Sequence, residues 1–259
     1  MRILVVNVNT STDITRALAE QARTVARPGT EIEALTPRFG PASVEGNFES
    51  HLAAVAVMDR VMTYDRPYDA VIQAGFGDHG KEGLQELCPT PVIDITEAAA
   101  HTACLLGHRY SVVTSLDRTV PMIWDRLTLA GVSTRCASVR ASGLGVLELE
   151  SDPTAAAQAV AQQARAAVEQ DGAEVIVLGC GGMAGMELTS EETAGAPVVD
   201  GLTSAVALAE SLVGLGLTTS RVRTFAAPRP KPLTHWPLSP ALEAQRPPVA
   251  PAAAPESRL

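Results

Sequence analysis

The chain has 259 residues, of which 46% are hydrophobic and 3% aromatic, so it is long enough to bury a sizeable core. Its net charge of −9 excludes nucleic acid and an anionic membrane surface as expected main partners. The apolar start Ile3–Val6 ends at Asn7, which argues against an export signal, and no later run is long enough for a membrane helix. We therefore expect a cytoplasmic protein with reduced cysteines.

Short β-branched runs alternate with amphipathic stretches along most of the chain. The predicted strands are Arg2–Val8, Ala70–Gly75, Val92–Asp94, Ser111–Thr114, Thr134–Val139, Glu174–Gly179 and Val198–Asp200. The predicted helices are Ser11–Val25, Glu49–Tyr64, Glu97–Leu106, Val120–Gly131, Pro153–Gln170 and Thr203–Gly214. Apolar strands separated by helices predict an α/β fold with parallel sheets that are covered on both faces.

An internal repeat predicts two related halves. Asp69–Gly77 is followed by Pro91-Val-Ile-Asp94, and Ala173–Gly182 is followed at nearly the same spacing by Pro197-Val-Val-Asp200. Each unit has the pattern of a strand, a glycine-rich turn, a short helix, a strand and a helix. Since ligands of open α/β sheets bind at the carboxyl ends of the strands, we expect the active site in a cleft between the halves.

The repeat and the composition also predict the domain organisation. We place the first half at residues 1–108 and the second at residues 109–225, as two pseudo-symmetric three-layer αβα units. The helix near residues 203–216 is a candidate to cross back to the first half. Residues 226–259 are dense in Pro and Ala, so we expect them to form a disordered tail.

Cys180 is the residue with the strongest chemical signal. It follows the apolar run Val175–Leu178 and has glycines on both sides, so it lies where a strand ends and a turn leads into a helix. Backbone N–H groups of such a turn and a helix N-terminus both favour the reactive thiolate. The alternative is inert packing, which is usual for a cysteine within a strand. The other cysteines fit that alternative: Cys88, Cys104 and Cys136.

The equivalent turn of the first half, Ala74–Gly80, contains no thiol. Its titratable side chains are Asp78 and His79. An imidazole titrates near neutral pH and can donate or accept a proton, so His79 is a candidate catalytic residue. A loop histidine is more often a solvated surface group, and Asp78 can equally form the turn or cap the next helix.

Polar residues and glycines at the strand ends are candidates to hold a substrate. The candidate substrate-binding residues are Asn9, Thr10, Gly75, Phe76, Gly77, Thr114, Gly181 and Gly182. The Asn and Thr side chains among them are also ordinary helix caps. The sequence contains no phosphate loop, no dinucleotide fingerprint and no clustered Cys and His, so neither a nucleotide cofactor nor a metal is predicted.

Several sequence motifs of the chain resemble those of a known family. Met1–Thr12 is similar to the opening of hydantoin and allantoin racemases. Ser43–Gly46, Phe76–Asp78, Leu178–Met183 and Pro197–Gly201 resemble motifs of that family in the same order, and the similarity extends from Met1 to Phe225. The resemblance implies the aspartate/glutamate racemase fold, no metal or pyridoxal cofactor, and a homo-oligomer.

In that family two cysteines face each other across the substrate. One thiolate removes the proton α to a carbonyl, and the other thiol returns a proton on the opposite face. The resemblance places the second-half cysteine at Cys180 and the first-half cysteine at position 75, where this chain has Gly75. It therefore implies a racemase or epimerase of a hydantoin, allantoin or similar ureide in which His79 or a water replaces the missing thiol.

Two alternatives follow from the missing thiol. One is a single-cysteine decarboxylase of the arylmalonate type, in which Gly75 makes room for a departing carboxylate, or a one-base proton-transfer isomerase. The other is a ligand-binding homologue that keeps the cleft and has lost the chemistry.

Overall fold

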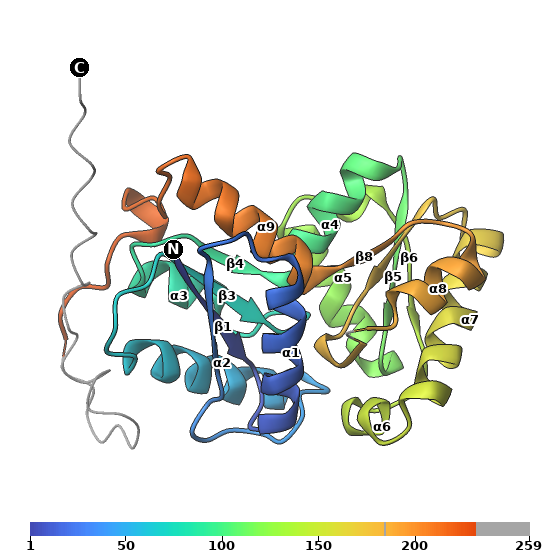
Figure 1. Cartoon of the computed structure of the whole chain (residues 1–259), viewed down its shortest axis with the longest axis horizontal. Coiled ribbons are helices and arrows are strands. Elements are labelled where there is room, and N and C mark those ends of the chain that lie inside the picture. Colours follow the sequence, from blue (N-terminus) through green and yellow to red (C-terminus); the bar gives the residue numbers. More distant parts are fainter. Residues whose placement is uncertain (184, 232–259) are drawn as a thin grey trace.

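The computed structural model describes residues 1–183 and 185–231, and Figure 1 shows two lobes side by side. Each lobe contains a four-stranded parallel sheet. The strand order is β2-β1-β3-β4 in the first lobe and β6-β5-β7-β8 in the second, so the topology repeats. The strands are β1 (Arg2–Asn7), β2 (Glu31–Leu35), β3 (Ala70–Ala74), β4 (Val92–Asp94), β5 (Tyr110–Thr114), β6 (Cys136–Ala141), β7 (Val175–Leu178) and β8 (Val198–Asp200). The predicted α/β fold with two parallel-sheet halves is confirmed.

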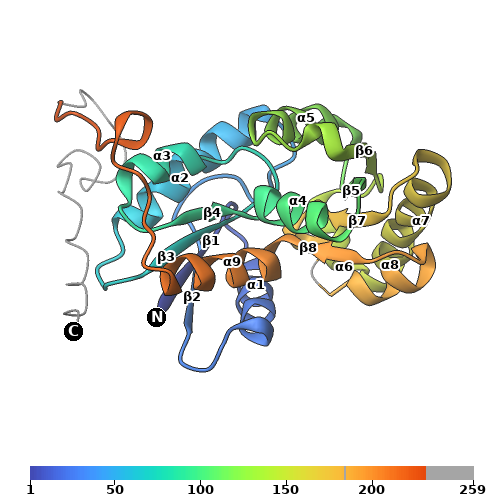
Figure 2. The same ribbon diagram turned by 90° about the horizontal axis from the view of Figure 1, so that it is seen from above.

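Helices cover both faces of each sheet (Figure 2). The helices are α1 (Thr12–Val25), α2 (Asn47–Met62), α3 (Lys81–Leu87), α4 (Ile95–Leu106), α5 (Val120–Leu129), α6 (Val146–Ser151), α7 (Pro153–Asp171), α8 (Glu187–Ala194) and α9 (Gly201–Gly214). Apolar residues of α1 and α9 pack on one face of the first sheet, and those of α2 and α3 pack on the other. In the second lobe α4 and α5 cover one face, and α7 and α8 cover the other.

The last helix of each lobe packs on the opposite lobe. Helix α4 follows β4 of the first sheet, but its buried residues Ala99, Ala100 and Ala103 lie in the core of the second lobe beside Val112 and Val177. Helix α9 follows β8, crosses back and packs in the first core beside Ile3 and Ile72. The two helices contact each other so closely that a Cβ atom on Gly201 would lie 2.5 Å from the carbonyl oxygen of Ile95.

An ionic cluster centred on a buried arginine and a buried aspartate also joins the lobes. The guanidinium of Arg126 on α5 is fully buried and donates to Asp94 (2.8 Å), Glu97 (2.7 Å) and Glu82 (2.6 Å) of the first lobe and its crossing helix. The ammonium group of Lys81 lies 2.5 Å from Glu97 and 3.6 Å from Asp94. Removal of one member would leave uncompensated buried charge, so this cluster fixes how α5 sits against α3 and α4.

The predicted elements agree with the structure except at short or polar segments. Strand β2 was missed because its two glutamates interrupt the apolar pattern, and only Ile32 and Leu35 are buried in it. Asp152 caps helix α7, since its side chain accepts a hydrogen bond from the N–H of Ala155 (3.1 Å).

Two further expectations concern membranes and the tail. None of the helices within residues 1–183 and 185–231 is long and apolar enough to cross a membrane. The predicted tail at residues 226–259 lies outside the described residues from position 232 onward.

Candidate functional site

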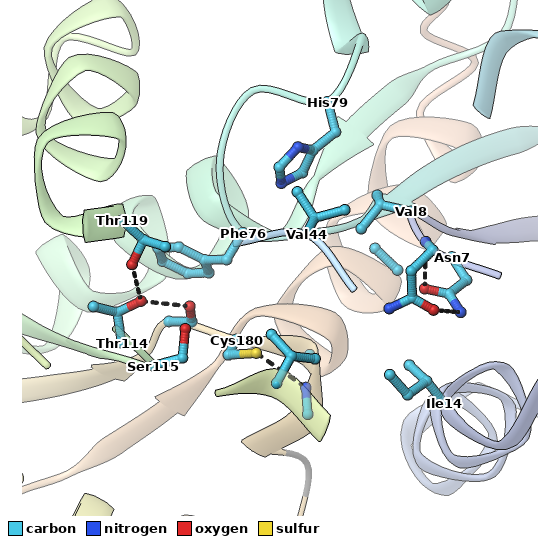
Figure 3. A pocket seen from close by; sticks show the side chains of 16 residues that line it. Asn7, Val8, Ile14, Val44, Phe76, His79, Thr114, Ser115, Thr119 and Cys180 are labelled. Atoms are coloured by element: carbon cyan, nitrogen blue, oxygen red, sulfur yellow. Dashed lines mark hydrogen bonds between the residues drawn. The ribbon is translucent and has the colours of Figure 1, made fainter. Parts of the chain in front are cut away.

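A small cavity of about 50 Å³ lies between the two lobes, at the carboxyl ends of β1, β3, β5 and β7 (Figure 3). The first lobe contributes Asn7, Val8, Asn9, Ile14, Val44, Ala74, Phe76 and His79. The second lobe contributes Thr114, Ser115, Thr119, Val146, Gly179, Cys180, Gly181 and Gly182. This position follows from the topology, because parallel strands present their carboxyl ends at one edge of the sheet.

Cys180 enters the cavity directly after β7. The preceding Gly179 is required there, since a Cβ atom would lie 2.6 Å from a methyl of Val112 and 2.9 Å from the carbonyl oxygen of Val113. The Gly179 N–H donates to that same carbonyl (2.7 Å) and so fixes the strand end. The N–H of Gly182 donates to the Cys180 sulfur (3.4 Å), a contact of the kind that stabilises a thiolate.

The predicted order of strand, glycine turn and helix is present after Cys180, but the helix begins several residues beyond the cysteine. A single 3₁₀ turn, Gly181–Met183, follows the cysteine, and α8 begins at Glu187. The carbonyl of Cys180 accepts from the N–H of Met183 (3.0 Å) and closes this turn. A local backbone N–H group, rather than a helix terminus, therefore lies beside the sulfur.

The other three thiols lie outside the cavity lining. Burial raises the pKa of Cys88 and Cys104, and it raises the pKa of Cys136 to about 12. Protonated thiols in apolar surroundings are poor nucleophiles and poor bases. Cys180 is thus the cysteine whose position suits chemistry.

His79 is buried, with 3% of its surface exposed, so the solvated-surface interpretation of this residue is wrong. Its imidazole enters the cavity from the first lobe, and the Cys180 sulfur enters from the second (Figure 3). The Nδ1 atom lies 2.9 Å from the hydroxyl oxygen of Ser50. Burial lowers the pKa of His79 from 6.5 to about 4, while Asp78, the Phe76 carbonyl and Asp94 oppose this shift and Arg126 adds to it.

The space beside Gly75 is not empty. A Cβ atom at this position would lie 2.5 Å from Cδ2 of His79 and 2.6 and 2.7 Å from the two methyls of Val8. The imidazole and Val8 therefore occupy the volume that a side chain at position 75 would need. The expectation that Gly75 leaves room for a departing carboxylate is wrong for this structure, because the ring fills that room.

Two asparagines form a rigid amide pair at the end of β1. The side-chain nitrogen of Asn7 donates to Asn9 Oδ1 (2.9 Å), to the Ser11 carbonyl (3.0 Å) and to Thr15 (3.0 Å). The Ser11 N–H donates to the same Asn9 oxygen (2.9 Å). The side-chain oxygen of Asn9 thus accepts two hydrogen bonds within the protein. Its side-chain nitrogen is the group that remains to donate to a ligand.

Hydroxyl groups line the second-lobe side of the cavity. Thr114 and Thr119 lie 3.0 Å apart through their hydroxyl oxygens, and Thr119 donates to the carbonyl of Leu116 (2.7 Å). Ser115 is 3% exposed and lines the cavity next to them. These groups can donate to, or accept from, the carbonyl and N–H groups of a polar ligand.

Two valines enclose the cavity from loops of opposite lobes. Val44 lies before α2, and Val146 is the first residue of α6. The carboxylate of Glu45 accepts a hydrogen bond from the N–H of Val146 (3.0 Å), which joins the two loops. Access to the cavity therefore depends on a contact between segments distant in sequence.

Five of the eight predicted substrate-binding residues line the cavity: Asn9, Phe76, Thr114, Gly181 and Gly182. Thr10, Gly75 and Gly77 do not. The hydroxyl of Thr10 donates to the Pro41 carbonyl (3.3 Å), and the N–H of Gly77 donates to Thr96 (2.9 Å), so both are used to hold loops. Gly75 is covered by the imidazole and Val8.

Other lining residues were not among the predicted ones. Asn7 and Ser115 lie close in sequence to the predicted residues Asn9 and Thr114. Their position at strand ends was the sequence feature that could have identified them. No sequence feature identified Val44 and Val146 as lining residues, because they reach the cavity only through the contact between the two lobes.

The cavity lining carries no fixed charge. Among the described residues, none of those that line it is Lys, Arg, Asp or Glu. Within the same part of the chain, no group of three or more His, Cys, Asp or Glu side chains is arranged to hold a metal ion. The lining therefore offers amides, hydroxyls, backbone N–H groups, one imidazole and one thiol.

Comparison with known proteins identifies the family of the chain. The Asp/Glu/hydantoin racemase family model matches residues 3–209. A hydantoin racemase of Paenarthrobacter aurescens is 39% identical over 233 residues, which covers 89% of this chain and 99% of the relative.

Solved structures show the same relationship. Allantoin racemase from Pseudomonas fluorescens has 68% sequence identity and a TM-score of 0.89, with 90% of this chain and 99% of that chain covered. Allantoin racemase from Klebsiella pneumoniae has 40% identity and a TM-score of 0.87, with 90% and 96% covered. Arylmalonate decarboxylase, at 15% identity and a TM-score of 0.57 over 83% of this chain and 94% of that one, shares the fold alone.

The crowding at Gly75 predicts a coupled effect on stability. Gly75→Ala should lower the free energy of unfolding by about 1–3 kcal/mol, because the new methyl enters the volume of the imidazole. In a His79→Ala background, Gly75→Ala should lower the free energy of unfolding by less, although the contact with Val8 remains. Urea unfolding of the four proteins of this double-mutant cycle measures the coupling, and an equal penalty in both backgrounds would contradict the assignment.

The lowered pKa of His79 predicts a pH dependence of stability. Between pH 6.5 and about 4 the unfolded chain binds a proton at this residue that the folded chain does not, so folded-state stability falls as the pH falls through this window. Relative to His79→Asn, the wild type should lose about 3 kcal/mol between pH 7 and 4. Chemical unfolding at several pH values measures this difference, with the exposed His101→Asn as matched control. Parallel pH profiles for the wild type and His79→Asn would disprove the shift.

Proposed function

Since the chain belongs to the Asp/Glu/hydantoin racemase family, we propose that it is a cofactor-independent racemase or epimerase of a neutral cyclic ureide of the hydantoin or allantoin type. In this proposal Cys180 and His79 exchange protons with the carbon α to the ring carbonyl. The observation that carries it is that a thiol and an imidazole enter one cavity from opposite lobes.

The two groups together can carry the single proton that the reaction requires. For one enantiomer, the reacting form has a neutral His79, as its lowered pKa favours, and a protonated Cys180 sulfur. The imidazole removes the proton from one enantiomer, which leaves an enolate, and the thiol protonates the opposite face. The opposite enantiomer reacts through the imidazolium–thiolate form, in which the same proton has changed places.

The lining favours an uncharged substrate. An amino acid such as aspartate or glutamate carries fixed charges, and burial of a charge without a partner is strongly unfavourable. The described lining supplies no charged partner for a carboxylate or an ammonium group. A cyclic ureide presents only N–H and C=O groups, which match the Asn9 amide, the Ser115 hydroxyl and the backbone N–H groups of the glycine turns.

The decarboxylase alternative is weaker on the same grounds. A substituted malonate brings two carboxylates into a lining without a cationic side chain, and the volume beside Gly75 is filled by His79. A ligand-binding homologue without catalysis would not need a thiol and an imidazole on opposite sides of the ligand. We therefore retain the racemase.

The proposal includes a cytoplasmic location and a homo-oligomer. Phe48 and Leu52, one turn apart on α2, are 72% and 45% exposed, and such apolar side chains are candidates for a subunit contact. Cofactor independence predicts that dialysis against a chelator leaves the activity intact.

Racemisation of L-5-methylhydantoin, followed by polarimetry, tests the proposal. Cys180→Ala and His79→Gln should each lower kcat by about 10²–10⁴-fold, the usual effect of removing an acid–base group. Cys104→Ala and His101→Gln remove the same side chains outside the cavity lining and should leave kcat unchanged. L-Aspartate should not turn over. Full activity of His79→Gln would refute the two-carrier mechanism, and turnover of aspartate would refute the neutral substrate.

A further inference from the structure

We propose that Ser50 is a positioning residue that holds the His79 imidazole in the tautomer with its proton on Nδ1, so that Nε2 is the nitrogen that accepts the substrate proton. This inference rests on the proposed function and adds a residue outside the cavity lining to its machinery.

The hydrogen bonds of Ser50 determine the tautomer. Ser50 lies in the first turns of α2, is 3% exposed, and donates its hydroxyl proton to the carbonyl of Asp78. The same oxygen lies 2.9 Å from Nδ1 of His79. A hydroxyl has one proton and two acceptor lone pairs, so a serine that donates to Asp78 can only accept from the ring. The ring proton must then reside on Nδ1.

The consequence lies at the other ring nitrogen. A free neutral imidazole populates both tautomers, and only the tautomer with the proton on Nδ1 has an unprotonated Nε2 that can act as a base. Nε2 is at the end of the ring away from Ser50, next to Gly77. Ser50 thereby selects the tautomer in which Nε2 is the basic nitrogen of the ring.

The surroundings also accommodate the imidazolium that forms when Nε2 accepts a proton. Nδ1–H remains bonded to Ser50, and the Phe76 carbonyl favours the charged ring. Asp78 and Asp94 favour it as well, whereas burial and Arg126 oppose it. Ser50 therefore determines where the first proton resides, and the neighbouring charges modulate how readily the second is taken up.

Nitrogen NMR of the histidine side chains tests the tautomer without any substrate. The His79 signal is identified by its loss in His79→Gln. In the wild type at pH 7 the shifts should show a protonated Nδ1 and an unprotonated Nε2. Ser50→Ala should move the ring towards a mixture of tautomers, and Ser50→Thr, which keeps the hydroxyl, should restore the wild-type pattern. A protonated Nε2 in the wild type would overturn the proposal.

Kinetics on L-5-methylhydantoin test the consequence for catalysis. Ser50→Ala should lower kcat about tenfold, the effect expected from one lost hydrogen bond, while KM changes less than about twofold. Ser50→Thr should recover most of kcat. A Ser50→Ala enzyme that is folded by circular dichroism and has wild-type kcat would refute the positioning role.

The tautomer of His79 and the racemase activity can be tested independently of each other. If the NMR pattern is as expected but the enzyme does not racemise the hydantoin, the proposed function fails and the tautomer assignment stands. If racemisation depends on His79 but neither the tautomer nor kcat responds to Ser50→Ala, the inference about Ser50 fails and the proposed function stands.

Discussion

The exchange of α4 and α9 between the lobes is the constraint on which the site depends. Each helix completes the apolar core of the lobe opposite to its own strand, so neither core is complete without the other lobe. The contact between Gly201 and the Ile95 carbonyl leaves no room for even a methyl group, and the buried Arg126 cluster adds ionic contacts to the same junction. The carboxyl ends of both sheets are thereby held around one cavity, and chemistry on opposite sides of a ligand becomes possible.

In the proposed mechanism, the first-lobe turn supplies an imidazole as its acid–base group. Gly75 has no side chain, and the imidazole of His79 occupies the volume that a side chain there would take. The ring is neutral at physiological pH because it is buried, and it approaches the cavity from the lobe opposite Cys180. Under the proposed function, His79 and Cys180 are the two proton carriers, and position 75 needs no thiol.

The sequence predicted the parts of this account that depend on local pattern. The strand ends at Asn9, Thr114 and Cys180 could be placed because apolar runs stop there, and the repeat indicated that they meet at one cleft. The burial of His79 could not be predicted, because it depends on contacts with residues distant in sequence, such as Ser50 on α2. The Glu45–Val146 contact likewise joins two loops that only the assembled lobes bring together.

The most direct test of two opposed proton carriers is the location of deuterium after partial reaction. One enantiomer of 5-methylhydantoin is incubated with the enzyme in heavy water to low conversion, and the separated enantiomers are analysed by mass spectrometry. The account predicts deuterium at the α-carbon of the product and little in the recovered starting enantiomer, whichever enantiomer is used. Equal labelling of product and recovered starting material would show that a single group serves both faces and would contradict the account.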